Sequence, residues 1–157
     1  MKLSTKGRYG LRAVVDLAVH ADEETIALSQ ISERQGISMN YLEQLVAKLK
    51  KAGIVTSVRG AQGGYMLAEP AENISVGDIL RALEGDLNPV DCSEIIKGDG
   101  NCSNSDSCVT KYVWKRISDS INEAVDSIKL SELVIESRKV QAGTGNTDTK
   151  GKQTCGK

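Results

Sequence analysis

The stretch that decides the fold is residues 29–68, which read SQISERQGISMNYLEQLVAKLKKAGIVTSVRGAQGGYMLA. A short helix is predicted from Ser29, a good N-cap residue, to the break at Gly36. Ser38 offers the next N-cap, and a second helix is predicted over about 39–52. The apolar side of this second helix consists of Leu42, Leu45, Val46 and Leu49. Two helices joined by a short turn that contains glycine are typical of a helix-turn-helix motif.

A β-hairpin is predicted immediately after these two helices. Residues 54–58 (IVTSV) and 65–68 (YMLA) are rich in strand-forming side chains, and a glycine-rich tip that begins with Arg59 separates them. A hairpin in this position is a wing. We therefore expect a mainly α protein with a small β-hairpin wing (an α+β fold), in the form of a winged helix-turn-helix.

More helices are expected on both sides of this unit. Residues 5–21 carry an apolar stripe at helical spacing, which predicts an amphipathic helix. Residues 75–78 (SVGD) have the form of a capping box that opens another helix, ending at Gly85. A long helix is predicted over about 109–128, and Ser131 caps a short final helix.

These patterns divide the chain into four parts. Residues 1–85 are predicted to form the winged helix-turn-helix domain, and residues 86–108 a cysteine-rich loop. Residues 109–138 are predicted to form the long helix and the short C-terminal helix, and residues 139–157 a disordered tail. The chain has no Phe and only 3% aromatic residues, so its core is aliphatic and thin. Association of subunits commonly compensates for such a core.

The charges are compatible with a nucleic-acid partner but do not require one. Residues 1–69 hold nine basic and seven acidic side chains, whereas residues 70–157 hold eleven and fourteen. No stretch approaches the roughly 20 apolar residues that span a membrane, and no secretory signal opens the chain. We therefore expect a cytoplasmic protein with no membrane partner, in which thiols stay reduced.

The polar face of the second predicted helix is a candidate DNA-reading surface. It carries Asn40, Gln44, Lys48 and Lys51, with Tyr41 and Glu43 at its N-terminal end. Amide side chains can pair with adenine, a glutamate can accept from cytosine, and lysines suit phosphates. Arg59 heads the wing tip, where a guanidinium can enter a narrow minor groove. The alternative is a solvated helix face with a surface arginine, but the two motifs together favour double-stranded DNA.

Three cysteines form a second candidate site. Cys92, Cys102 and Cys108 lie in one polar loop, with nine and then five residues between them. Thiolates bind iron and zinc strongly, so a metal or an iron–sulfur cluster could order this loop. Zinc sites usually contain closer cysteine pairs, which favours a cluster over zinc. The alternative is three unligated thiols. Cys155 stands apart and is interpreted as a free thiol of the tail.

Several stretches, taken as a set, resemble the IscR/NsrR/CymR family of winged-helix transcription repressors. The resemblance covers roughly residues 1–135 and is greatest to the IscR-like members, which regulate iron–sulfur biogenesis. The matching stretches are 6–9 (KGRY), 31–38 (ISERQGIS), 41–45 (YLEQL), 57–60 (SVRG), 63–65 (GGY), 76–78 (VGD), the three-cysteine loop followed by Trp114, and 130–133 (LSEL).

This resemblance implies a homodimer in which the helix over 109–128 crosses its partner. It also implies a 2Fe–2S cluster on the three cysteines, and repression of the genes for cluster assembly. The DNA contacts that it implies come from Ser38, Asn40, Tyr41, Glu43, Gln44 and Arg59.

The sequence departs from the IscR-like pattern at one ligand position. Those members usually place a histidine three residues after the third cysteine, where this chain has Lys111. The fourth ligand is therefore open between Asp106, Cys155, a residue of the partner subunit and a small molecule. NsrR-like members can use an acidic residue near the N-terminus, but Arg8 stands at that position here.

Two other functions remain open at this point. One is a CymR-like repressor of cysteine metabolism, which would sense through a partner protein and hold zinc or no metal at its cysteines. The other is an iron–sulfur carrier or scaffold whose winged helix contacts proteins. No nucleophile motif or phosphate-binding loop indicates an enzyme.

Overall fold

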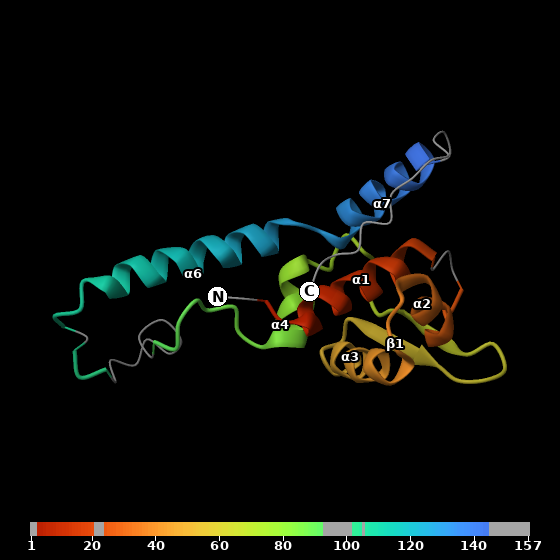
Figure 1. The fold of residues 1–157 in the computed structure, drawn as a ribbon, viewed down its shortest axis with the longest axis horizontal. Helices are drawn as coiled ribbons and strands as arrows, with labels where there is room; N and C mark the ends of the chain where they lie inside the picture. The colour runs from red at the N-terminus through yellow and green to blue at the C-terminus, as the bar shows by residue number, and fades with distance from the viewer. Residues whose placement is uncertain (1–2, 21–23, 93–101, 105, 145–157) are drawn as a thin grey trace.

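The computed structural model describes residues 3–20, 24–92, 102–104 and 106–144. Four helices and a hairpin form a compact body, from which one long helix projects as an arm before the last helix returns to the body (Figure 1). This arrangement confirms the predicted fold class. The elements are α1 (Thr5–His20), α2 (Leu28–Gln35), α3 (Met39–Lys51), β1 (Val55–Val58), β2 (Gly64–Leu67), α4 (Val76–Glu84), α6 (Thr110–Ser127) and α7 (Leu130–Thr144).

The helix-turn-helix packs on α1 through the aliphatic residues that the sequence pattern singles out. Leu42, Leu45 and Leu49 of α3 are almost fully buried, and they share one core with Ile31 of α2 and with α1. Gly36 ends α2 with a φ of 63°, a left-handed conformation that glycine adopts at little cost. The spacing of the apolar residues along α3 therefore determines which face of this helix is buried and which face is exposed.

A buried carboxylate fixes α2 against α1. Asp16 of α1 is 4% exposed, and its oxygens accept hydrogen bonds from Arg34 Nη2 at 2.6 Å and Gln35 Nε2 at 2.7 Å. A buried carboxylate is costly unless it is paired in this way. The contact therefore holds the last turn of α2 in place, just before the turn that leads into α3.

The wing is a two-stranded antiparallel hairpin. Val55 pairs with Leu67 and Val58 with Gly64, so the tip lies between residues 58 and 64. Ile26 adds one further bridge, because its backbone exchanges two 2.8 Å hydrogen bonds with Tyr65. The Ile26 backbone approaches Gly64 so closely that a Cβ at position 64 would lie 2.7 Å from its carbonyl oxygen. This close approach explains the second glycine of the GGY stretch.

Helix α4 connects the body to the arm. It begins with the predicted capping box, in which Ser75 Oγ accepts from the Asp78 amide at 3.0 Å and Asp78 Oδ2 accepts from the Ser75 amide at 2.9 Å. Gly10 of α1 lies so close to Leu83 that a Cβ at position 10 would overlap that side chain. The absence of a side chain at Gly10 thus allows α1 and α4 to cross at short range.

The last residue of α4 caps the first turn of α1. Glu84 accepts hydrogen bonds from the backbone amides of Ser4 and Gly7 at 2.9 and 2.8 Å, and from Ser4 Oγ at 2.6 Å. A carboxylate is favourable at a helix N-terminus. Burial raises the pKa of Glu84, but the hydrogen bonds from Ser4 and Gly7 outweigh it, so the pKa lies below its ordinary value.

Replacement of Glu84 by glutamine is expected to reduce stability at neutral pH by about 1–2 kcal/mol, because hydrogen bonds to a charged acceptor are lost. The contribution of the carboxylate is complete above the pKa of the unfolded chain, about 4.3, and disappears as the pH falls through the lower pKa of the folded state. Melting temperatures of both proteins between pH 7 and pH 3 test this expectation. The gap between the two curves should narrow with acid; a constant gap would contradict the capping role.

Two details of the predicted elements were wrong. Helix α2 begins at Leu28 rather than after Ser29, because the Gln30 side chain accepts a hydrogen bond from the Ala27 amide at 3.0 Å and caps the helix two residues earlier. Helix α7 continues to Thr144, so residues 139–144 of the predicted disordered tail are helical. Residues 145–157, including Cys155, lie outside the described residues.

Candidate DNA interface and cysteine segment

The N-terminal half of α3 presents an uninterrupted polar face. Asn40, Glu43 and Gln44 are exposed, and they lie opposite the buried leucines of the same helix. Ser38 occupies the N-cap position, but its side chain makes no capping hydrogen bond. The predicted base-reading residues are thus gathered at the start of one helix, with their polar groups available to a partner.

Tyr41 differs from these residues because it is anchored within the protein. Its hydroxyl lies 3.1 Å from Thr5 Oγ1, and its ring meets the Tyr9 ring edge-on, with 6.1 Å between centroids. Arg12 stacks over the same Tyr9 ring at 5.6 Å. The start of α1 is therefore part of the surface beside the recognition helix. Sequence reasoning missed this contribution, although the KGRY stretch at residues 6–9 was a signal of it.

The wing places Arg59 at the edge of the same surface. Arg59 is exposed directly after β1, and Gly60 takes a φ of 121° that side chains rarely allow. The Gly63 amide donates to the Gly60 carbonyl at 3.0 Å and closes the tip. A narrow tip of this kind allows an arginine to approach a nucleic-acid groove closely.

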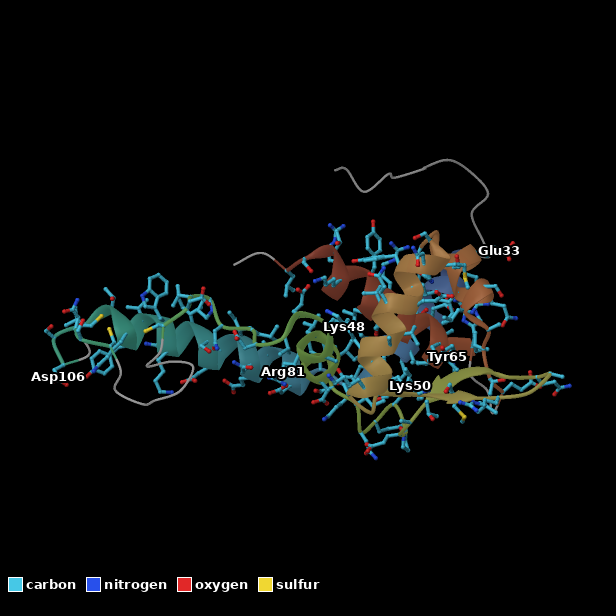
Figure 2. The ribbon with its side chains drawn as sticks, turned by 90° about the horizontal axis from the view of Figure 1, so that it is seen from below. Glu33, Lys48, Lys50, Tyr65, Arg81 and Asp106 are labelled. Carbon is cyan, nitrogen blue, oxygen red and sulfur yellow. The ribbon has the colours of Figure 1, made fainter. Side chains whose placement is uncertain are left out.

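The lysines of α3 take three different environments. Lys48 Nζ lies 3.3 Å from the Leu83 carbonyl of α4, and Lys50 Nζ donates to Ser57 Oγ of the wing at 2.6 Å. Figure 2 shows Lys48 between α3 and α4. Lys51 is exposed. Lys48, which the sequence pattern assigned to phosphate contact, is exposed and also contacts α4.

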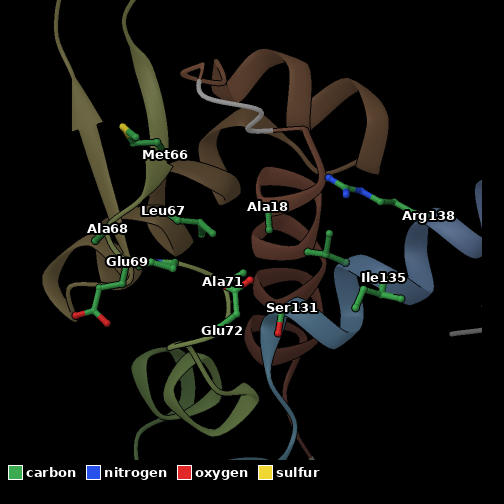
Figure 3. A pocket seen from close by; sticks show the side chains of 12 residues that line it. Ala18, Met66, Leu67, Ala68, Glu69, Ala71, Glu72, Ser131, Ile135 and Arg138 are labelled. Carbon is green, nitrogen blue, oxygen red and sulfur yellow. The ribbon is translucent and has the colours of Figure 1, made fainter.

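A groove of about 540 Å³ lies between the base of the wing, α1 and α7, and Figure 3 shows its lining. Glu69 and Glu72 are exposed on its rim. Arg138 lines the same groove, so its charged residues carry a net negative charge, which disfavours phosphates.

The three cysteines of the loop are free thiols, each partly buried. Cys108 precedes α6, and its sulfur lies 3.2 Å from Thr110 Oγ1. Hydrogen bonds from the Thr110 hydroxyl and the Lys111 amide lower the pKa of Cys108 below its ordinary value. This position favours the thiolate, the form that binds metals.

The ligand set is not assembled within the described part of the chain. There, no three His, Cys, Asp or Glu side chains converge as a metal site would require. Residues 93–101 of the loop lie outside the described residues. Lys111 Nζ lies 5.5 Å from the centre of the Tyr112 ring, and Asp106 is exposed at the far end of α6 (Figure 2). The donor atoms suit iron or zinc, so the chemistry of the set fits a metal group.

A winged helix-turn-helix with an exposed polar recognition helix and an arginine-tipped wing defines a DNA-binding transcription regulator. The chain belongs to the Rrf2 family, described as iron-dependent transcriptional regulators, whose profile matches residues 3–136. Membership of a family of regulators confirms the expectation that the chain is not an enzyme.

Curated relatives and solved structures agree with this assignment. The chain is 40% identical over 141 residues to the HTH-type transcriptional regulator IscR of Vibrio parahaemolyticus, which is 90% of this chain and 82% of that protein. It is 40% identical over 151 residues to IscR of Pectobacterium atrosepticum, and the match covers 96% of this chain and 90% of that protein. These matches confirm the resemblance that the sequence motifs indicated.

Two solved structures share the fold. IscR of T. potens has a TM-score of 0.71 at 44% identity, covering 96% of this chain and 94% of that one. CymR, the global cysteine regulator of B. subtilis, has a TM-score of 0.70 at 39% identity, and the match covers 87% of this chain and 98% of that one. No helix in the described part of this chain is both long and apolar enough to cross a membrane.

Proposed function

We propose that this regulator is a cytoplasmic homodimeric repressor that senses iron–sulfur supply and controls the genes for cluster assembly. Its sensor would be a 2Fe–2S cluster held by Cys92, Cys102 and Cys108. The observation that carries the proposal is the placement of Cys108 at the start of the arm, which joins the body through α4, with its sulfur 3.2 Å from Thr110 Oγ1. The curated relatives named IscR support the same assignment.

The DNA-binding surface proposed for this function consists of the start of α3 and the wing. Asn40 and Gln44 would read adenine and Glu43 would accept from cytosine, with Ser38 and Tyr41 beside them. Arg59 would enter the minor groove. Lys48, which is exposed on the same helix and also lies near the Leu83 carbonyl of α4, would contact phosphate.

The arm supports the dimer in this proposal. Along α6, Tyr112 is 68% exposed and Val113 52%, and Ile117 is 37% exposed one turn later. Ser118 is the one buried residue of this helix, all of which is described. An amphipathic helix with an exposed apolar stripe commonly packs on another copy of itself. A second copy would bury the stripe and place two recognition helices on one duplex.

A bound cluster supplies thiolate-to-iron bonds that depend on iron and oxidant supply. The residues of the chain would bind this group: three thiolates would hold it, and the Thr110 hydroxyl would stabilise the Cys108 thiolate. A site assembled only with its metal couples binding to the ordering of the loop. The fourth ligand remains open between Asp106, Cys155, a partner residue and a small molecule.

The test is anaerobic purification followed by iron and sulfide analysis. We expect a brown protein with about two irons and two sulfides per subunit. A promoter fragment should bind with strong salt dependence, and its affinity should differ between the loaded and the stripped protein. Iron-free protein from this preparation would reject cluster sensing, while DNA binding without it would leave the regulator itself intact.

A second candidate is a CymR-like repressor of cysteine metabolism, which the structural similarity to B. subtilis CymR favours. Such a regulator would respond through a protein partner, and its cysteines would hold zinc or nothing. Elemental analysis separates the two candidates, because the first requires iron with sulfide. A carrier or scaffold role, in turn, would be rejected by strong salt-dependent binding to a promoter.

A further inference from the structure

The polar contacts between the arm and α4 form the starting point. Arg81 of α4 donates to both oxygens of Asp126 at 2.7 and 2.9 Å, and to Asn122 Oδ1 at 2.6 Å. Figure 2 shows Arg81 at the junction of α4 with α6. The Arg81 and Asp126 side chains are 35% and 47% exposed, so this pair contributes little to stability through charge alone. Its bidentate geometry instead fixes the position of α6 on α4.

One turn toward the cysteines, a second set of contacts joins α6 to the loop. Ser118 is 5% exposed, and its hydroxyl donates to Asn88 Oδ1 at 2.7 Å. Asn122 Nδ2 donates to the Ser118 carbonyl at 2.8 Å, so the same asparagine contacts both Ser118 and Arg81. An unbroken chain of hydrogen bonds therefore runs from Asn88 to α4.

Asn88 precedes Cys92 by four residues, so a short segment links the two positions. Four extended residues span at most about 13–14 Å. Cys108 precedes Ser118 by ten residues, a distance of roughly 15 Å along a helix. Residues 88–92 are therefore long enough for Cys92 to reach the neighbourhood of Cys108 while Asn88 keeps its contact with Ser118, and the position of Cys92 is tied to this contact by a short segment.

The same last turn of α4 that holds Arg81 also touches the DNA-binding elements. The Leu83 carbonyl accepts from Lys48 of α3, and Glu84 caps the start of α1. Any shift of α4 relative to the arm therefore acts on the recognition helix and on the α1 turn beside it.

We propose that these contacts form a polar relay that couples the cysteine segment to the recognition helix. The relay consists of Asn88, Ser118, Asn122, Arg81 and Lys48. They act as positioning residues: filling the cysteine site moves Cys92, residues 88–92 pass this movement to the contact of Asn88 with Ser118, and the packing of α4 against α3 shifts in response. This inference rests on the proposed function and specifies how its signal reaches the DNA.

The test compares the affinity of loaded and stripped protein for one promoter fragment. Asn88→Ala, Ser118→Ala and Arg81→Ala each interrupt the relay. Two matched controls leave it intact: Asn88→Asp keeps an acceptor oxygen for Ser118, and Asp119→Ala removes an exposed ion pair with Lys115 on the same helix. Iron and sulfide content and the melting temperature of each stripped variant are measured alongside.

We expect the ratio between the two affinities, typically about 5- to 150-fold for a coupled site, to fall toward unity in the three relay variants. Their stripped forms should bind DNA as the wild type does, and their iron content should be retained. The double variant Ser118→Ala/Arg81→Ala should lose no more than either single one, because both interrupt one path. Both controls should keep the wild-type ratio.

If the ratio between loaded and stripped affinities is unchanged in the three relay variants, the relay is overturned. The same holds if Asp119→Ala lowers this ratio as much as the relay variants do. Equal affinities of loaded and stripped wild-type protein are a different result, because they reject cluster sensing itself and the relay with it. The wild-type measurement thus separates failure of the relay from failure of the proposed function.

Discussion

Alanine in place of Gln44 is expected to weaken binding to the selected operator by about 1–3 kcal/mol, with little change in binding to random duplex. The side chain is exposed on the base-reading face of α3, where a bidentate contact to one base edge is possible. Alanine in place of Arg59 is expected to weaken binding to both duplexes, because a charge in the minor groove reads shape more than sequence. It should also reduce the slope of log affinity against log salt by about 1.

The operator for these measurements can be selected from a pool of random duplexes with the wild-type protein. Gln141→Ala and Arg116→Ala are matched controls, since both side chains are exposed on helices outside the DNA-binding surface. Neither should change affinity or salt slope. If Gln44→Ala and Arg59→Ala each lose as much affinity for the random duplex as for the operator, the division between base reading and groove entry is contradicted.

The elements that bury an apolar face were predictable from the sequence because their periodicity is local. The leucines of α3 determine both its burial and the exposure of Gln44 on the opposite side. The same holds for the capping box at Ser75, whose two partners are three residues apart. The start of α2 could not be predicted from this pattern. Ser29 is the better N-cap residue, but the Gln30 side chain caps the helix at Ala27, two residues before Ser29.

Contacts between residues distant in sequence were beyond local reasoning. Lys48 has the spacing of a phosphate-binding residue, and only the fold shows that the C-terminal end of α4 also offers its ammonium group a carbonyl. Ser118 stands in a polar position of an amphipathic helix, and only the fold reveals that it is buried against Asn88. The cysteine site has the same limitation, because spacing identifies the thiols but not the geometry that joins them.

Alanine at Cys92, Cys102 or Cys108 is expected to abolish the retention of iron and sulfide. A 2Fe–2S cluster needs four terminal ligands, two on each iron, and the loss of one thiolate would leave one iron a ligand short. The stripped variants should melt at the wild-type temperature, since the three thiols lie outside the hydrophobic core. Their DNA affinity should equal that of stripped wild-type protein and no longer respond to iron.

The matched control for these variants is Cys155→Ala, which removes a thiol of the same chemistry near the C-terminus. It should retain iron and sulfide at the wild-type level if the tail thiol is free. Loss of both in Cys155→Ala would instead identify Cys155 as the fourth ligand, and loss in Asp106→Ala would identify the exposed carboxylate beside α6. Full retention of iron in Cys92→Ala would contradict the three-cysteine site, because the thiols that remain could not complete it.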